Sequence, residues 1–390
     1  MIELSFPIDK MIAVRRAIHS NPELSNNEYD TQRIVRDTLI SAGITSIDDI
    51  AGTGLLVDIV GKQGPGPIIG LRADMDALPI QEATSFDFAS QNPGIMHACG
   101  HDVHTSILVG SIIALHEVRD RYAGTIRCIF QPAEEAEPLG GKRVVASGIL
   151  SDVEGVFALH VDSDIEVGKI GVRSGPLLAG GQEFRISVRG KAGHAARPHL
   201  SIDAIVVGAE IVRGLQHISS RQINPLDPVV VTVGKFNAGT ASNIIADAAT
   251  VEGTFRVLDE TVREQVRYSM RQMIEGVASG YGAEADLELT DGEPVLVNDV
   301  DLTELIREVG QEVLGNNNVV ELDRPSMGSE DFAFYVEAAP ITMFRLGIRN
   351  EIKGYTFPVH TPNFSVDEHS IGIGAKVMTA AALKYLEKAN

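Results

Sequence analysis

The spacing of hydrophobic residues in the first part of the chain alternates between a helical and an extended pattern. Residues 11–42 place apolar side chains at helical intervals and stop at Gly43, which predicts helical structure over this stretch. Two apolar runs, 54–60 and 67–71, are separated by a turn rich in glycine and proline, and both predict buried strands. Strands that alternate with helices indicate an α/β sheet covered on both faces.

The same pattern continues and leads to candidate site residues. A helix that Asp102 can cap is followed by strand-like runs at 125–130 and 155–159. In open α/β sheets, ligands bind at the carboxyl ends of strands. Residues 131–135 and His160 directly follow the two runs. We therefore expect both to lie at a functional site.

The pattern changes at a glycine-rich stretch, residues 174–181. Beyond it the segments read strand, helix, strand, strand, helix, strand, at 183–188, 202–215, 229–233, 248–255, 260–278 and 283–289. This order is that of a ferredoxin-like unit. The α/β pattern resumes after Pro294, so the second pattern is inserted into the first.

Length supports this division, because a chain of 390 residues exceeds the size at which one core usually stops growing. We predict an α/β catalytic domain formed by residues 1–179 and 294–390. Residues 180–293 would form a ferredoxin-like α+β lid domain between them. The two glycine-rich crossings are natural hinges for such a lid.

Composition limits the classes of partner. A net charge of −20 argues against nucleic acid, because phosphate binding depends on Lys and Arg, and it also disfavours anionic membranes. The longest apolar stretch, around 107–115, is too short to span a bilayer. Residues 1–10 lack the apolar core of a signal peptide, and the two cysteines have unlike surroundings. We expect a cytoplasmic protein with no nucleic-acid or membrane partner.

The segment 97–104 carries the strongest chemical signal. Cys99 and His101 lie one residue apart, so an extended backbone points both to the same side. Further along, the adjacent carboxylates Glu134 and Glu135 follow an apolar run. Thiolate, imidazole and carboxylate are ligands of divalent metals such as zinc. The alternative for an isolated Cys-x-His is a buried cysteine beside a surface histidine.

Two later histidines extend the set into a candidate dinuclear site. His160 follows another predicted strand, and His360 lies in a turn between prolines. A two-metal hydrolase needs about four or five N, O or S ligands, a water and a nearby carboxylate base. The ligands would be Cys99, His101, Glu135, His160 and His360. Glu134 would act as the base, although the sequence alone leaves open which glutamate binds metal.

Ordered motifs run along nearly the whole chain. They lie at 15–31, 71–79, 97–105, 131–135, 160, 193–195, 242–243, 327–332 and 360–362. Together they resemble the M20 metallopeptidase family, in particular its amidohydrolase branch of hippurate hydrolases, N-acyl-amino-acid deacylases and auxin-conjugate hydrolases. The resemblance implies a zinc-peptidase-like catalytic domain with two divalent ions per chain, held by the five ligands above, and Glu134 as general base. Zinc suits cysteine and histidine, while manganese, cobalt and nickel fit the same geometry.

One motif departs from the wider family, which usually carries His-x-Asp in its first half. Here the stretch reads Asp74-Met75-Asp76. This change is typical of the amidohydrolase branch, in which the Cys-x-His pair takes up ligation. We expect Asp74 and Asp76 to orient a metal ligand instead. The resemblance gives no ligand role to His97 or His104.

The inserted segment resembles the lid of the family at residues 190–198. His194 would stabilise the oxyanion of amide hydrolysis, and a surface histidine that caps the following helix is the alternative. Asn243 resembles the lid asparagine that contacts substrate. Arg256 would pair with the substrate carboxylate, although an arginine on a strand often only faces solvent. Residues 326–331 would line the pocket, with Glu330 and Asp331 supporting His360 or capping a helix.

The resulting prediction is a metal-dependent amidohydrolase that releases an amino acid from an N-acetyl- or N-aroyl-amino acid, a small-molecule substrate. A dipeptidase or carboxypeptidase of the same family is the first alternative. A catalytically inactive metal-binding protein is another, and a hydrolase with Cys99 as nucleophile is the least favoured. Assembly into a homodimer or homotetramer through the lid domain stays open.

Overall fold

The computed structural model describes all residues except 1, 3 and 390. The chain forms two compact units, each with its own hydrophobic core. Unit 1 comprises residues 1–177, 297–324 and 331–390, and unit 2 comprises residues 178–296 and 325–330. The short segment 325–330 joins unit 2 through Ala179, whose N–H donates to Ser326 O at 3.1 Å.

Unit 1 is built on an eight-stranded sheet in the order β1-β2-β4-β3-β5-β16-β6-β15. The strands are β1 (Asp48–Ile50), β2 (Gly54–Val60), β3 (Ile68–Asp74), β4 (Thr125–Gln131), β5 (Gly155–Glu166), β6 (Ile170–Val172), β15 (Val319–Glu321) and β16 (Ile341–Arg349). β3 runs parallel to both β4 and β5, and β16 runs parallel to β5. Nearly every residue of β3 is buried, so helices or loops cover both faces. The predicted α/β class is confirmed.

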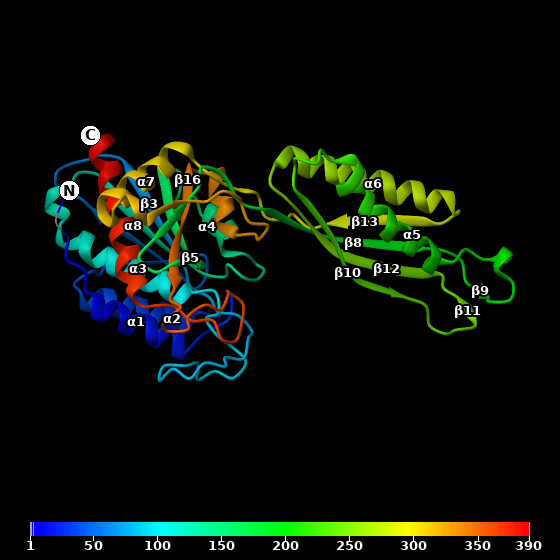
Figure 1. Ribbon diagram of the computed structural model, residues 1–390, viewed down its shortest axis with the longest axis horizontal. Helices are drawn as coiled ribbons and strands as arrows, with labels where there is room; N and C mark the ends of the chain where they lie inside the picture. The colour runs from blue at the N-terminus through cyan, green and yellow to red at the C-terminus, as the bar shows by residue number, and fades with distance from the viewer. Residues whose placement is uncertain (1, 3, 390) are drawn as a thin grey trace. The chain divides into compact units, whose positions relative to one another are not determined.

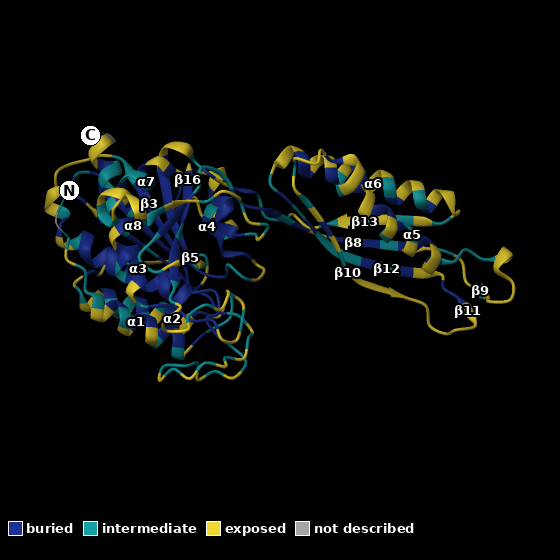
Figure 2. Cartoon of the chain, viewed as in Figure 1, coloured by how far each residue is buried: buried dark blue, intermediate teal, exposed yellow. Residues whose placement is uncertain are grey.

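The helices of unit 1 pack around this sheet (Figure 1). They are α1 (Ile8–Ser20), α2 (Tyr29–Ser41), α3 (His101–Glu117), α4 (Gly140–Ala146), α7 (Val300–Leu314) and α8 (His369–Ala389). Figure 2 shows that α3 is buried along most of its length. No helix among the described residues is long and apolar enough to cross a bilayer.

Two details of unit 1 differ from the sequence prediction. The helical stretch 11–42 is broken into α1 and α2, because Pro22 disfavours helical geometry at Asn21, whose φ is −129° and ψ 57°. Asp102 does not cap α3, since the N-cap is Gly100. The Asp102 carboxylate instead binds Arg15 and His19 at 2.7 and 2.8 Å.

Unit 2 is a four-stranded antiparallel sheet in the order β10-β12-β8-β13, with two helices on one face (Figure 1). Its elements are β8 (Gly180–Arg189), α5 (Ala204–His217), β10 (Val229–Ala238), β12 (Ala248–Val257), α6 (Glu260–Gly280) and β13 (Glu284–Leu289). Buried and exposed residues alternate along β8, as expected when helices cover only one face. The element order matches the predicted β-α-β-β-α-β series.

Candidate metal centre

The candidate ligands come from the edge of the unit 1 sheet where the parallel strands end. Glu134 and Glu135 follow the end of β4, and His101 begins α3. His160 lies inside β5, which continues past the predicted strand end to Glu166. His360 lies in the loop after β16, with a φ of 61°. Residues far apart in sequence therefore meet at one place.

Gly100 allows Cys99 and His101 to share this site. Its φ is 85°, a left-handed conformation that side chains disfavour. A β-carbon at Gly100 would also lie 2.5 Å from Cγ2 of Val161. Only glycine fits here, so the turn between the two ligands and the start of α3 is fixed by both backbone geometry and packing.

The ligand atoms form overlapping groups of three, each with all donors within 4.8 Å of one another. The groups are Cys99–His101–His160, Cys99–Glu135–His360 and His101–Glu134–Glu135. Cys99 Sγ lies 3.3 Å from His160 Nε2, and His360 Nε2 lies 3.3 Å from Glu135 Oε1. The structure thus brings together all five predicted ligands and Glu134.

This donor set fits a divalent metal. His101 Nε2 is buried and has no hydrogen-bond partner within the described part of the chain, although buried polar atoms are normally paired. It faces carboxylate oxygens of Glu134 and Glu135, each at 4.0 Å. His160 donates its Nδ1 proton to Val161 O at 2.8 Å, which leaves the Nε2 lone pair for a cation.

Two of the donors hold protons in the metal-free protein. Burial raises the pKa of the Cys99 thiol. Hydrogen bonds to Cys99 and Glu135 raise the pKa of His360 to about 10. Burial lowers the pKa of His160 well below its usual value, with help from His104 and Arg345. Protons therefore occupy Cys99 and His360 until a metal displaces them.

Asp76 holds two of the candidate ligands. Its Oδ1 accepts from His101 Nδ1 at 3.1 Å, and its Oδ2 accepts from the backbone N–H of Glu135 at 3.0 Å. Burial raises the pKa of Asp76, but its hydrogen bond and ion pair with His101 outweigh this and lower it. Asp76 thus stays ionised and sets the orientation of the His101 ring.

Asp74 acts through a histidine that sequence reasoning set aside. His104 Nδ1 donates to Asp74 Oδ1 at 2.7 Å, and His104 Nε2 accepts from Val161 N at 3.0 Å. This buried histidine ties α3 to both β3 and β5. Its position three residues after His101, on the same helical face, was the available signal.

A buried arginine completes the support, and sequence reasoning missed it. Arg72 donates to Gln131 Oε1 at 3.0 Å, to Asp74 Oδ2 at 2.6 Å and to Asp331 Oδ1 at 3.0 Å. Asp331 also accepts from Gly141 N at 2.6 Å. An arginine within an apolar strand was the signal, because a buried charge requires partners.

The predicted unit 2 residues fall into two places. His194, in β9 (Gly193–His194), is exposed and pairs with Ile244 of β11 (Ile244–Ile245). Asn243 lies beside it, because Asn243 O accepts from Ala195 N at 3.1 Å. His194 Nδ1 accepts from Ala196 N at 3.1 Å, and the cap of α5 is Asp203. The alternative of a helix-capping His194 is therefore wrong.

Arg256 lies in β12 of the four-stranded sheet, near the end of that strand that is remote from Asn243. It pairs with Gly181 across β8, whereas Ala248, at the Asn243 end of β12, pairs with Arg189. The eight steps along the strand from Ala248 to Arg256 span roughly 26 Å at about 3.3 Å each. The Arg256 guanidinium donates to Thr254 Oγ1 at 3.0 Å. One copy of the chain therefore cannot bring Arg256 and Asn243 to the same small molecule.

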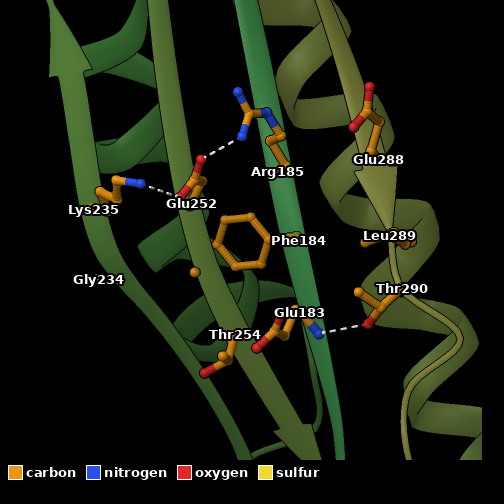
Figure 3. A pocket seen from close by; sticks show the side chains of 11 residues that line it. Glu183, Phe184, Arg185, Gly234, Lys235, Glu252, Thr254, Glu288, Leu289 and Thr290 are labelled. Atoms are coloured by element: carbon orange, nitrogen blue, oxygen red, sulfur yellow. Dashed lines mark hydrogen bonds and ion pairs between the residues drawn. The ribbon is translucent and has the colours of Figure 1, made fainter. Parts of the chain in front are cut away.

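A groove of about 590 Å³ crosses the exposed face of the unit 2 sheet (Figure 3). Three of its charged side chains pair with one another, since Glu252 binds both Arg185 at 2.6 Å and Lys235 at 3.0 Å. None of the predicted site residues lines it. The groove is thus separate from the chemistry described above.

Known proteins match the chain along almost its full length. A thermostable carboxypeptidase of Saccharolobus solfataricus is 39% identical over 385 residues, covering 97% of this chain and 96% of that protein. An N-acetylcysteine deacetylase of Bacillus subtilis is 38% identical over 379 residues, covering 97% of both.

A solved structure and a family model agree with these relatives. A dinuclear metal-binding M20 peptidase from Bacillus subtilis has a TM-score of 0.86 and 36% identity, covering 97% of this chain and 98% of that one. The model of peptidase family M20/M25/M40 matches residues 70–384. The resemblance inferred from the motifs is confirmed. The chain belongs to peptidase family M20/M25/M40 and is a hydrolase of that family.

Proposed function

We propose that the protein is a metal-dependent amidohydrolase that cleaves the amide bond of N-acyl amino acids. The observation that carries the proposal is the single cluster formed by Cys99, His101, Glu135 and their partners around Glu134. Glu134 belongs to the same donor group as His101 and Glu135. A carboxylate in this position can take a proton from a water held by the ligands.

Cys99, His101, Glu135, His160 and His360 would hold two divalent ions. When bound, such ions supply a water with a pKa near neutrality and polarise the amide carbonyl. Glu134 would accept the proton of that water and pass it to the leaving nitrogen. Asp76 would keep the His101 ring in place throughout, through the bond at 3.1 Å.

Unit 2 would supply the groups that recognise the substrate. His194 would donate a hydrogen bond to the oxyanion, and Asn243 and Arg256 would bind polar groups of the substrate, with the α-carboxylate paired to arginine. His194 and Asn243 support this assignment because both are exposed and lie together at the two-stranded β9–β11 sheet. The separation of Arg256 from Asn243 adds a condition: two copies of the chain must contribute if both act on one substrate.

The proposed metal is zinc, because a site with one thiolate and three imidazoles matches its preference for sulfur and nitrogen. Manganese, cobalt and nickel accept the same ligand types, so their availability also matters. A carboxypeptidase or dipeptidase is the second candidate function. The similarity to a carboxypeptidase favours it, and both reactions break an amide bond.

The test is amino-acid release from a panel of acetyl-, benzoyl- and aminoacyl-amino acids, with protein loaded with each metal in turn. We expect acetyl or benzoyl substrates to turn over fastest. Preference for the aminoacyl substrates would favour the peptidase. Glu134→Ala should lower kcat by about 10²–10⁴-fold with metal content unchanged. Normal turnover in that variant would contradict the mechanism, and bound metal without any hydrolysis would favour an inactive metal-binding protein.

A further inference from the structure

A buried glutamate outside the ligand set contacts the loop that carries Glu134. Glu28, which immediately precedes α2, has no exposed surface. Its Oε1 accepts from the backbone N–H of Ala133 at 2.8 Å and of Asn26 at 2.9 Å. Its Oε2 accepts from Thr53 Oγ1 at 2.5 Å. The carboxylate thus reaches a residue 105 positions away in sequence.

The residue that Glu28 holds is in an unfavourable conformation. Ala133 has a φ of 50°, which costs a non-glycine residue about 1–2 kcal/mol. Its carbonyl accepts from Gly140 N at 2.8 Å, so the peptide groups before and after Ala133 are both held by hydrogen bonds. Such backbone geometry persists only where the surroundings impose it. Ala133 directly precedes Glu134, so its φ and ψ set where the Glu134 side chain begins.

The segment that carries Glu28, residues 25–28, is also linked to the backbone that follows Glu134. Ser25 Oγ donates to Asp76 Oδ2 at 2.6 Å, and that oxygen accepts from Glu135 N at 3.0 Å. Residues 25–28 therefore fix the backbone before Glu134 directly, and the backbone after it through Asp76.

We propose that Glu28 is a positioning residue that holds the Glu134 loop in its reactive geometry. This proposal rests on the function proposed above, in which Glu134 is the base. A buried carboxyl group is costly to desolvate unless its oxygens accept hydrogen bonds, and an apolar side chain here would leave the N–H groups of Ala133 and Asn26 without this acceptor. What the site needs is an oxygen that accepts two backbone N–H groups. Glutamine also offers such an oxygen, and its NH₂ can donate to Thr53.

The chain offers a matched control in Glu23. Its carboxylate also accepts backbone N–H groups near the start of α2, from Asp30 at 3.1 Å and Thr31 at 2.9 Å. It differs from Glu28 in that the N–H groups from which it accepts lie in α2 and not in the Glu134 loop. Loss of the Glu23 side chain thus reports the effect of loosening α2 by itself.

The experiment compares Glu28→Ala, Glu28→Gln and Glu23→Ala in full-length, metal-loaded protein. We measure kcat and KM on the best acyl-amino acid, metal content, and the absorption spectrum of the cobalt-loaded form. Glu28→Ala should lower kcat by roughly 10²-fold, as expected for a displacement of about 1 Å, with KM little changed. Its cobalt spectrum should shift, because Glu135 lies on the same loop. Glu28→Gln should restore most of kcat, and Glu23→Ala should keep both kcat and the spectrum.

Three results would overturn the proposal: an unchanged kcat and spectrum in Glu28→Ala, an equal loss in Glu23→Ala, or no rescue by glutamine. If the wild-type protein hydrolyses no substrate, the proposed function fails and the cobalt spectra alone decide the role of Glu28. If Glu28→Ala does not fold, Thr53→Val replaces it, since it removes only the hydroxyl that orients Glu28. That variant should lower kcat several-fold and shift the spectrum, and an unchanged kcat and spectrum would contradict the role.

Discussion

His101 is bound to Asp76 through one ring nitrogen only. Its Nδ1 lies 3.1 Å from Asp76 Oδ1, while its buried Nε2 has no hydrogen-bond partner among the described residues. A histidine fixed at one nitrogen and open at the other is prepared for a metal, because the bond to the carboxylate sets the tautomer and the direction of the lone pair. Asp76 thus contacts the ring nitrogen of His101 that is not available to a metal. This contact fits the orienting role predicted for Asp76 from the sequence.

Removing that support should weaken the metal site. Asp76→Ala is expected to lower metal affinity by about 10–100-fold, because His101 and the Glu135 backbone both lose their partner. Competition with a coloured chelator measures the effect. Asp152→Ala is the control, since its exposed carboxylate binds Arg127 at 2.6 Å and belongs to none of the donor groups. Equal affinity in wild type and Asp76→Ala would refute the orienting role.

Cys99→Ala should lose metal before it loses its fold. The Cys99 sulfur belongs to two of the donor groups, so an ion held by either group would lose a ligand, whereas alanine fits the buried space. Metal analysis should show a reduced metal-to-protein ratio with an unchanged circular dichroism spectrum. Cys128, buried in β4, provides the matched variant Cys128→Ala, which should keep its metal. Chelator-resistant hydrolysis would instead point to Cys99 as a nucleophile.

Metal affinity should rise with pH. In the metal-free protein the pKa of His360 is raised to about 10 by Cys99 and Glu135, so at neutral pH a proton must leave before a cation binds. Each displaced proton makes affinity increase about tenfold per pH unit up to that pKa. Chelator competition across neutral pH measures the slope. His360→Gln should make it shallower by one proton, and a flat profile in the wild type would contradict the assignment.

Arg72 should be essential for stability. Its guanidinium is buried and binds Asp74 and Asp331, which are buried too. Arg72→Met leaves these charges without their partner and should destabilise the protein by about 3–5 kcal/mol. Urea unfolding of the metal-free protein measures this. Arg127→Met, which removes a partly exposed pair with Asp58 on the neighbouring strand, should cost about 1 kcal/mol or less. Similar losses in both variants would argue against a special role for Arg72.

Active sites should complement each other between copies of the chain. Because Arg256 lies near the end of β12 that is remote from Asn243, a substrate that contacts both requires two copies. Asn243→Ala and Arg256→Ala should each have low activity alone, and their mixture should recover activity after subunit exchange. Sedimentation should show a dimer or larger assembly. A monomer with full activity would mean that Arg256 or Asn243 does not bind substrate.

The sequence by itself determined the α/β class, the β-α-β-β-α-β order of the inserted segment and the five metal-ligand candidates with Glu134. These follow from local signals: hydrophobic spacing, glycines at turns, and chemically distinctive residues in short motifs. The catalytic roles of those residues stay predictions. The break between α1 and α2 could also have been predicted from the sequence, because Pro22 is a local signal.

Only the tertiary structure decided how the ligands are supported and where the substrate-binding candidates lie. Glu28 meets Ala133, and Arg72 meets Asp331, across long stretches of sequence, and no periodicity records such pairs. The separation of Arg256 from Asn243 depends on strand register, which fixes Arg256 opposite Gly181 and Ala248 opposite Arg189. Local pattern selects which residues carry the chemistry, whereas strand register and buried long-range hydrogen bonds set their positions in space.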